Sequence, residues 1–415
     1  MRWKRDQSIV PVLMFHSIGM GSIPWKWSEL TESVDTFEKV LARLARKGFR
    51  TVSLQDLYEH MSGVRRLPGN SIVLTFDDGY LDNWVHAAPL LRKYGMRGTV
   101  YVTPEFVQDG SVPRPVAGES PTLNSDPKSD DVVGFMNWEE LRRIDAEGVL
   151  DVQCHALTHT WYFSGPKVVD FHRLGGSDAY PWMAWNARPD RKPYYLKEQQ
   201  DSFVRWGQPV FEHQKSLVVR RFFPDAGQVE EITEFVAANG GEAFFAANDW
   251  RSKLDTRFPV LQNANEFPGR YESEEERQER VLHELIKSRE ILERELKKRV
   301  EFFSWPGGGV DDSALELARQ AGFKSWTLSS WQKPKFRNRP GADASEIKRV
   351  SGHARVFWKD RLVKAESASW IILRVLTHQG SLLSKLAGVI RKAGWIVATV
   401  LRGQPKTKES SVARR

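Results

Sequence analysis

One stretch decides the fold: Ser71-Ile-Val-Leu-Thr-Phe-Asp-Asp-Gly79. Four of its first six residues are apolar, as in a strand that is buried on both faces. Two carboxylates and a glycine follow where the strand ends, and Gly79 permits a tight turn that exposes both acids. In β/α sheets the carboxyl ends of the strands carry the functional groups. The stretch therefore predicts a central strand with a site at its end, although an Asp-Asp-Gly turn without chemistry is the more common meaning of the three residues alone.

Strand and helix signals alternate on both sides of this stretch. The pattern predicts strands at 9–15, 98–103, 150–154, 300–304, 323–328 and 347–351, and helices at 34–46, 83–94, 137–146, 272–299 and 312–320. Repeated β-α units of this length predict an α/β fold in which helices cover a parallel sheet, either open or closed into a barrel.

Two regions break this rhythm. Residues 160–270 are rich in Pro, Gly and aromatics with little periodicity, which predicts a compact insertion with one helix near 229–238. Trp182 and Trp185 lie in its most unusual part and either contact a sugar or pack within the loop. Residues 365–415 interleave apolar and basic positions, which indicates a helical tail that lies on an anionic membrane surface, packs on the domain or forms a dimer contact.

The bulk composition limits the class of protein. The chain has 415 residues, a net charge of +8, 40% hydrophobic and 27% charged residues, as is ordinary for a globular protein. The positive surplus favours an anionic partner, and because no nucleic-acid motif is present we do not expect nucleic acid to be that partner. The single Cys154 suits a reducing compartment. The N-terminus lacks the features of a signal peptide, so a cytoplasmic location is expected.

A second motif, His155-Ala-Leu-Thr-His159, also follows a predicted strand. Two His four residues apart lie on one side of a helical turn and can bind the same cation. Such a pair alone is often coincidental. Together with one carboxylate, however, two His make the open three-ligand site of a hydrolytic metal centre. A third strand end supplies Phe302-Phe-Ser-Trp-Pro-Gly-Gly308, whose backbone N–H groups could stabilise an oxyanion.

These motifs resemble the polysaccharide deacetylase family, the NodB-homology domain of carbohydrate esterase family 4. The matching pieces are Val10-Pro-Val-Leu-Met-Phe-His16, Thr75-Phe-Asp-Asp-Gly79, His155-Ala-Leu-Thr-His159 and Ser304-Trp-Pro-Gly-Gly308, in the order that the family uses. The resemblance covers about residues 8–160 and 270–355. It implies a distorted (β/α) barrel of about seven strands over 1–364, interrupted by the insertion and followed by the tail.

The resemblance also implies roles for individual residues. Asp77 would be the general base, and Asp78, His155 and His159 would bind a divalent metal, zinc in most of the family with cobalt or another ion in some. The metal would polarise an acetyl carbonyl, and a backbone N–H near Gly307 would help to stabilise the oxyanion.

The chain departs from the family pattern near its third motif. Ser304 stands where the family often has an Arg that orients the base, Gly307 stands where a Tyr often follows the Pro, and Ser330-Trp331 is the nearest match to the usual Asp-Trp motif. His353 lies about where the family's late His occurs and is a candidate general acid. His16 ends the first predicted strand and either faces the site or forms a packed, hydrogen-bonded contact.

Three functions are compatible with these motifs. The first is an enzyme that removes N-acetyl groups from a glycan or glycolipid saccharide, with the tail and the basic charge favouring a substrate near the inner membrane face. The second is an O-acetyl esterase with the same centre. The third is a glycan-binding protein that has the fold but no activity, and the complete set of Asp77, Asp78, His155 and His159 argues against it.

Overall fold

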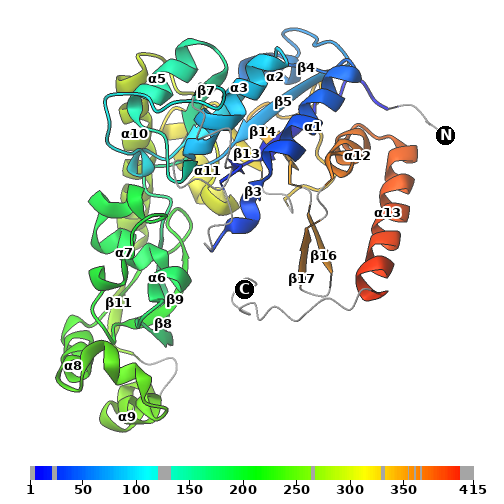
Figure 1. Cartoon of the computed structure of the whole chain (residues 1–415). Helices are drawn as coiled ribbons and strands as arrows, with labels where there is room; N and C mark the ends of the chain where they lie inside the picture. The colour runs from blue at the N-terminus through cyan, green and yellow to red at the C-terminus, as the bar shows by residue number, and fades with distance from the viewer. Residues whose placement is uncertain are drawn as a thin grey trace.

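The fold is a parallel β-barrel covered by helices, with a second lobe below it (Figure 1). In this computed structural model, the described residues are 5–20, 26–119, 132–262, 267–328, 332–353, 355–358, 361–364 and 367–401. The barrel strands are β1 (Val12–Phe15), β5 (Ser71–Phe76), β6 (Gly98–Val102), β7 (Leu150–Cys154), β12 (Phe302–Phe303), β13 (Ser325–Leu328), β14 (Glu346–Lys348) and β15 (Val350–Ser351).

The barrel is closed by one short segment near residue 349. The strands pair in the order β14-β13-β12-β7-β6-β5-β1-β15, and all of these pairs are parallel. Only Arg349 separates β14 from β15, so Lys348 pairs with β13 and Val350, two residues later, pairs with β1. If β14 and β15 are counted as one bent strand, the barrel has the predicted seven strands, and the predicted fold class is confirmed.

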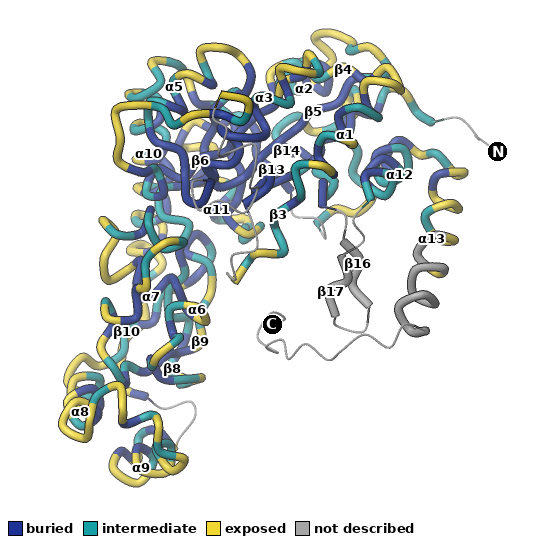
Figure 2. Tube along the Cα trace, viewed as in Figure 1, coloured by how far each residue is buried: buried dark blue, intermediate teal, exposed yellow. Residues whose placement is uncertain are grey.

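Helices surround this barrel as the β-α alternation predicted. They are α1 (Val34–Arg46), α2 (Leu54–Met61), α3 (Ala88–Lys93), α5 (Trp138–Ala146), α10 (Glu274–Leu296) and α11 (Asp312–Gln320). Local signals set their ends: the Ser33 side chain caps α1, and Asn137 forms a capping box with Glu140 at the start of α5. Figure 2 shows that the strands and the inner helix faces are buried. Shorter pairs are β2 (Ser17–Ile18) with β3 (Thr31–Glu32), and β4 (Arg50–Thr51) with β5.

The insertion is more regular than the sequence predicted. A long antiparallel pair, β8 (Trp161–Phe171) with β9 (Pro209–Lys215), forms its spine. Around it lie α6 (Gly176–Ala179), α7 (Pro181–Ala187), α8 (Ala226–Ala238), α9 (Trp250–Arg257) and the pair β10 (Phe222–Pro224) with β11 (Gly269–Tyr271). The prediction of a single helix was therefore wrong, because only α8 has a readable pattern and the strand pair is broken by register shifts.

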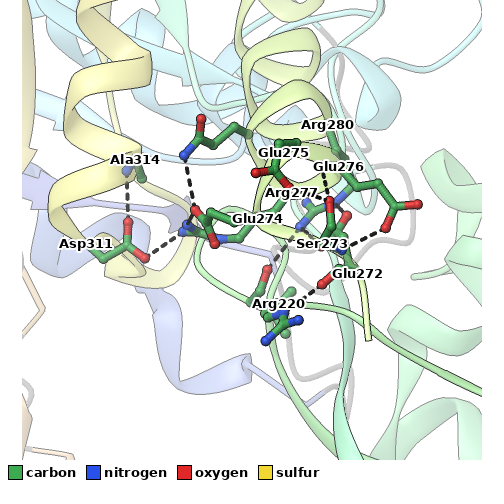
Figure 3. Close-up of polar contacts among 12 residues, drawn as sticks. Arg220, Glu272, Ser273, Glu274, Glu275, Glu276, Arg277, Arg280, Asp311 and Ala314 are labelled. Atoms are coloured by element: carbon green, nitrogen blue, oxygen red, sulfur yellow. Dashed lines mark hydrogen bonds and ion pairs between the residues drawn. The ribbon is translucent and has the colours of Figure 1, made fainter. Parts of the chain in front are cut away.

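Ion pairs join the insertion to the start of α10 (Figure 3). Arg280 donates to both carboxylate oxygens of Glu272 at 2.7 and 2.9 Å, and to the backbone oxygens of Ser216 and Val219. Arg220 donates to the backbone oxygen of Glu272 at 2.6 Å. Because Glu272 is only 3% exposed, the two hydrogen bonds from Arg280 supply partners for a carboxylate that has lost most of its hydration.

The tail begins with a helix that belongs to the barrel. In α12 (Ala368–His378), Ile371, Ile372 and Val375 are part of the main hydrophobic core. The next helix, α13 (Leu382–Leu401), stands away from the barrel in Figure 1. A hairpin, β16 (Arg355–Trp358) with β17 (Arg361–Lys364), precedes both helices. No helix in the described ranges is both long and apolar enough to cross a bilayer.

Candidate metal centre and active site

The two acids at the end of β5 point to different neighbours. The Asp77 backbone still follows the strand, since its N–H donates to the Phe15 oxygen at 3.0 Å. Asp78 then adopts a left-handed conformation with φ 75°, and Gly79 follows at φ 79°. A left-handed backbone is costly for a residue with a side chain. This turn directs Asp78 toward two imidazoles, whereas Asp77 meets other neighbours.

His155 and His159 meet Asp78, but not by the predicted helical turn. The segment between them is irregular, with left-handed backbone at Ala156 (φ 62°) and His159 (φ 45°). The Nε2 atoms of His155 and His159 lie 3.2 and 3.3 Å from Asp78 Oδ1. The expectation that one cation could be shared therefore agrees with the geometry, although the expected helix is wrong.

A backbone contact fixes the orientation of His155. Its Nδ1 lies 2.7 Å from the Ser304 carbonyl oxygen, which can only accept a hydrogen bond. Nδ1 therefore carries the proton, and the Nε2 lone pair points toward Asp78. Ligating His residues in proteins are held in the same way. Ser304 belongs to the third motif, so that motif contributes to the centre through its backbone.

Asp78, His155 and His159 fit a metal ion. One ligand atom from each lies within 4.8 Å of the others. Burial would raise the pKa of Asp78, but the adjacent imidazoles of His155 and His159 outweigh it and hold this pKa well below its ordinary value. Burial lowers the pKa of His159, with Asp78 opposing in part, which favours the neutral imidazole that a metal needs. Two imidazoles and a carboxylate are the donor set of open hydrolytic centres.

Asp77 forms a buried ion pair that the sequence did not predict. Arg349 donates to Asp77 Oδ1 at 2.6 Å and to Oδ2 at 2.8 Å, with side chains 8% and 4% exposed. Burial would raise the pKa of Asp77, but Arg349, followed by His155 and His16, keeps it below its ordinary value. Arg349 is the junction residue between β14 and β15. An arginine thus contacts the candidate base although the third motif carries Ser304 instead.

His16 and His353 form a pair beside Asp77. His16 Nε2 lies 3.9 Å from Asp77 Oδ2, and its Nδ1 lies 3.1 Å from His353 Nε2. His353 is 3% exposed and also packs on the Phe15 ring. The structure therefore places His16 next to the candidate base, and His353 behind His16.

The Gly-rich turn has a close neighbour in the insertion. Gly307 is left-handed (φ 55°), and its carbonyl accepts a hydrogen bond from Lys215 Nζ. A Cβ at this position would approach Lys215 Cε to 2.8 Å, so both the backbone angle and the space favour glycine. Ser330-Trp331, the other weak match to the family, lies outside the described residues.

The aromatic residues of the insertion divide into buried and half-buried groups. Trp182 and Trp185 are 4% and 2% exposed and pack in a cluster of aromatic side chains. Of the two roles expected for them, sugar contact or packing within the loop, the structure shows packing. Trp161 is only partly buried and contacts the His159 ring, with centroids 5.9 Å apart. Trp27 stacks on Trp161 at 5.9 Å. Trp161 is therefore the indole that contacts a candidate metal ligand, and Trp27 lies behind it.

Sequence comparisons match part of the chain to a family model and to a curated relative. Residues 65–203 match the family model described as polysaccharide deacetylase. YxkH of Bacillus subtilis (strain 168), named as a polysaccharide deacetylase, is 31% identical over 93 residues, which are 22% of this chain and 31% of YxkH. The chain thus spans about a third of that relative's length.

Solved structures with a similar trace include two deacetylases. One is the BpsB deacetylase domain from Bordetella bronchiseptica, with a TM-score of 0.49, 18% identity and coverage of 84% of this chain and 97% of that one. The other is a de-N-acetylase from Aggregatibacter actinomycetemcomitans, with a TM-score of 0.49, 18% identity and coverage of 82% and 94%. The resemblance inferred from the motifs is confirmed by the family match, and residues 65–203 carry the sequence pattern of the polysaccharide deacetylase family.

Proposed function

We propose that this chain is a metal-dependent hydrolase that removes N-acetyl groups from a glycan or glycolipid saccharide. One observation carries the proposal: Asp78, His155 and His159 converge on one point, while the neighbouring Asp77 is held apart from them by Arg349. A binding protein does not require such a separation of two adjacent acids. Zinc is the ion that best suits two imidazoles and one carboxylate in an open hydrolytic site.

Different residues of the chain have different roles in the proposed reaction. When bound, the metal would act as a Lewis acid on the acetyl carbonyl. Asp77 takes a proton from the attacking water, and Arg349 fixes the direction of its carboxylate. The C–N bond breaks, the acetyl carbon gains the hydroxyl oxygen of water, and the nitrogen leaves as an amine after it receives a proton.

His16 is the best-placed group to protonate the leaving nitrogen. Its Nε2 lies 3.9 Å from Asp77 Oδ2, so the candidate acid and the candidate base are neighbours. His353 contacts the other nitrogen of His16 and so positions that ring. The sequence favoured His353 as the acid. We instead infer that His353 acts through His16, and the backbone N–H near Gly307 remains a candidate contact for the oxyanion.

An acetylated saccharide would enter from the side of the insertion. Trp161 lies next to His159 and Trp27 stacks on Trp161, and the flat apolar face of a sugar packs on such rings. A cavity of about 290 Å³ continues from Trp27 along Asp178, Glu198 and Gln199. Carboxylates and amides of this kind accept and donate hydrogen bonds to hydroxyl groups.

The test is release of acetate by the purified chain supplied with zinc or cobalt. N-acetylated oligosaccharides and an acetyl ester are compared, since faster turnover of the ester alone would favour an O-acetyl esterase. Asp77→Asn should abolish turnover and keep the metal, whereas His155→Ala should lose metal by elemental analysis. If no substrate is turned over and Asp77→Asn binds glycan as well as the wild type does, the chain is a binding protein and the proposal fails.

A further inference from the structure

A second candidate site lies on the outer side of the barrel closure. An open cavity of about 380 Å³ is lined by the loop before β14, by the closing segment and by α12 and α13. Lys348 and Val350 line it, whereas Arg349 between them reaches Asp77 inside the barrel. Successive side chains of a strand point to opposite faces. The cavity is therefore separate from the candidate active site.

The polar lining of this cavity is basic. Arg337, Lys348, Arg374 and Lys385 contribute four cations, His378 adds an imidazole, and none of the described lining residues is acidic. Three of these cations donate to main-chain oxygens: Arg337 to that of Phe336 at 2.7 Å, Arg374 to that of His353 at 2.6 Å, and Lys348 Nζ to that of Gln332. Cations gathered in one hollow from separate parts of the chain repel each other, so an anion stabilises them. Arg and Lys together are the usual partners of phosphate oxygens.

An exposed apolar surface borders the same cavity. On α13, five large apolar side chains are 43–63% exposed: Leu382, Leu383, Leu386, Val389 and Ile390. Val389 and Lys385 both line the cavity and lie four residues apart, hence on one side of the helix. Figure 2 shows this part of α13 as mostly exposed. A contiguous apolar surface beside a basic hollow matches an amphiphile with an anionic head.

We propose that this cavity binds the phosphate group of an anionic membrane lipid, while the apolar side chains of α13 enter the membrane interface. The chemistry of both parts is needed: the cations recognise the head group, and the helix surface contacts the acyl region. Binding here does not require hydrolysis, because the metal centre lies on the other face of the closing segment. The lipid site is thus independent of the proposed enzyme activity.

The experiment is sedimentation of the full chain with vesicles of phosphatidylcholine, alone or mixed with phosphatidic acid. The wild type should bind the mixed vesicles and not the neutral ones. Arg337→Gln and Lys385→Gln should each weaken binding roughly fivefold, which corresponds to about 1 kcal/mol per cation near an anionic surface. Leu386→Gln should weaken it as well. Turnover of a soluble substrate by Lys385→Gln should equal that of the wild type.

Matched controls lie in the insertion, far from the cavity. Lys253→Gln removes an exposed cation and Leu174→Gln an exposed apolar side chain, and neither should change binding. Equal losses in these controls, equal binding to neutral vesicles, or no binding to either vesicle would overturn the proposal. Two further results would also overturn it: titration of the cavity by inorganic phosphate without vesicle binding, and a dimer that Leu386→Gln dissociates without vesicle binding.

Discussion

Arg349 holds Asp77 by two hydrogen bonds in a site where both side chains are buried. A planar guanidinium matches a carboxylate in a way that an ammonium cannot. We expect Arg349→Lys to lower kcat by about 10- to 100-fold, the usual cost of losing a group that orients a reactive residue. KM should change little, because no part of Arg349 is required for substrate contact in the proposed mechanism. Steady-state kinetics on one N-acetylated substrate measure both values.

A second substitution at this position, one that removes the charge, should move the pH profile in a defined direction. Arg349 is the largest of the influences that lower the pKa of Asp77 against the effect of burial. In Arg349→Met, burial acts with less opposition, so the pKa of Asp77 rises and the acid limb of kcat/KM moves to higher pH. Circular dichroism should confirm that the variant is folded. An acid limb at the wild-type pH, with kcat reduced, would assign Arg349 a purely structural role.

The sequence was informative about this site wherever the signal was local. Asp77, Asp78, His155 and His159 stand at predicted strand ends, and the structure brings three of them together. The conformation of His155–His159 was predicted wrongly, since left-handed backbone at Ala156 and His159 has no signature in residues other than glycine. Arg349 was missed because its contact depends on which strands close the barrel, and no local pattern encodes that pairing.

At the scale of elements, the start of α10 fastens the insertion to the barrel (Figure 3). Arg280 is 16% exposed and Glu272 is 4% exposed in their side chains. Arg280→Met should lower the free energy of unfolding by about 3–5 kcal/mol, because Glu272 is left charged and buried without its partner. Arg270→Met is the matched control: its ion pair with Glu276 is 60% and 49% exposed, so its loss should cost at most about 1 kcal/mol. Urea denaturation measures both, and equal costs would contradict the argument.

His378 in helix α12 should make the stability of the folded protein depend on pH. Burial lowers the pKa of His378 to about 4, with Arg337 and Lys348 adding to the effect. The pKa of His378 in the folded state is below its unfolded value of about 6.5. The protein therefore loses no stability through this group above pH 6.5, and it loses stability as the pH falls toward 4. Between pH 7 and 5 the loss from this group is about 2 kcal/mol. In His378→Gln the decrease in Tm over that range should be smaller, and an unchanged decrease would mean that His378 is not buried as the neutral form.

Several strands and helices with a regular pattern of apolar residues have the same first and last residues in the structure as in the prediction. These are strands β5 and β7 and helices α1 and α11. A buried strand or an amphipathic helix can be recognised because its apolar residues lie close together in the sequence. The pair β8 with β9 was missed. Its partners are far apart in sequence, and register shifts at Phe163/Val168 and Val168/Asp170 interrupt the alternation that marks a strand.

At the scale of the whole molecule, a shared aromatic cluster joins the barrel to the insertion. Tyr80, Phe106 and Phe135 come from barrel loops, and Trp182 and Trp185 come from α7. Trp185 lies edge-on to Phe106 with centroids 5.3 Å apart, and Phe106 also contacts the His159 ring at 5.8 Å. The insertion therefore supports a ligand of the candidate metal centre through packed rings, so the lobe that would receive the substrate also stabilises the site.

A tryptophan of the insertion can stabilise the fold or contact the sugar, and substitutions can distinguish these two roles. Trp185→Ala should lower the free energy of unfolding by about 3–5 kcal/mol, as expected for a large buried aromatic, and any loss of activity should follow the loss of folded protein. Trp161→Ala, in contrast, removes a half-buried ring beside His159 and should raise KM for an oligosaccharide while the Tm falls much less. Thermal unfolding and kinetics on both variants provide the comparison. A raised KM with an unchanged Tm in Trp185→Ala would make that ring a sugar contact, and the cluster would then be part of the substrate cleft.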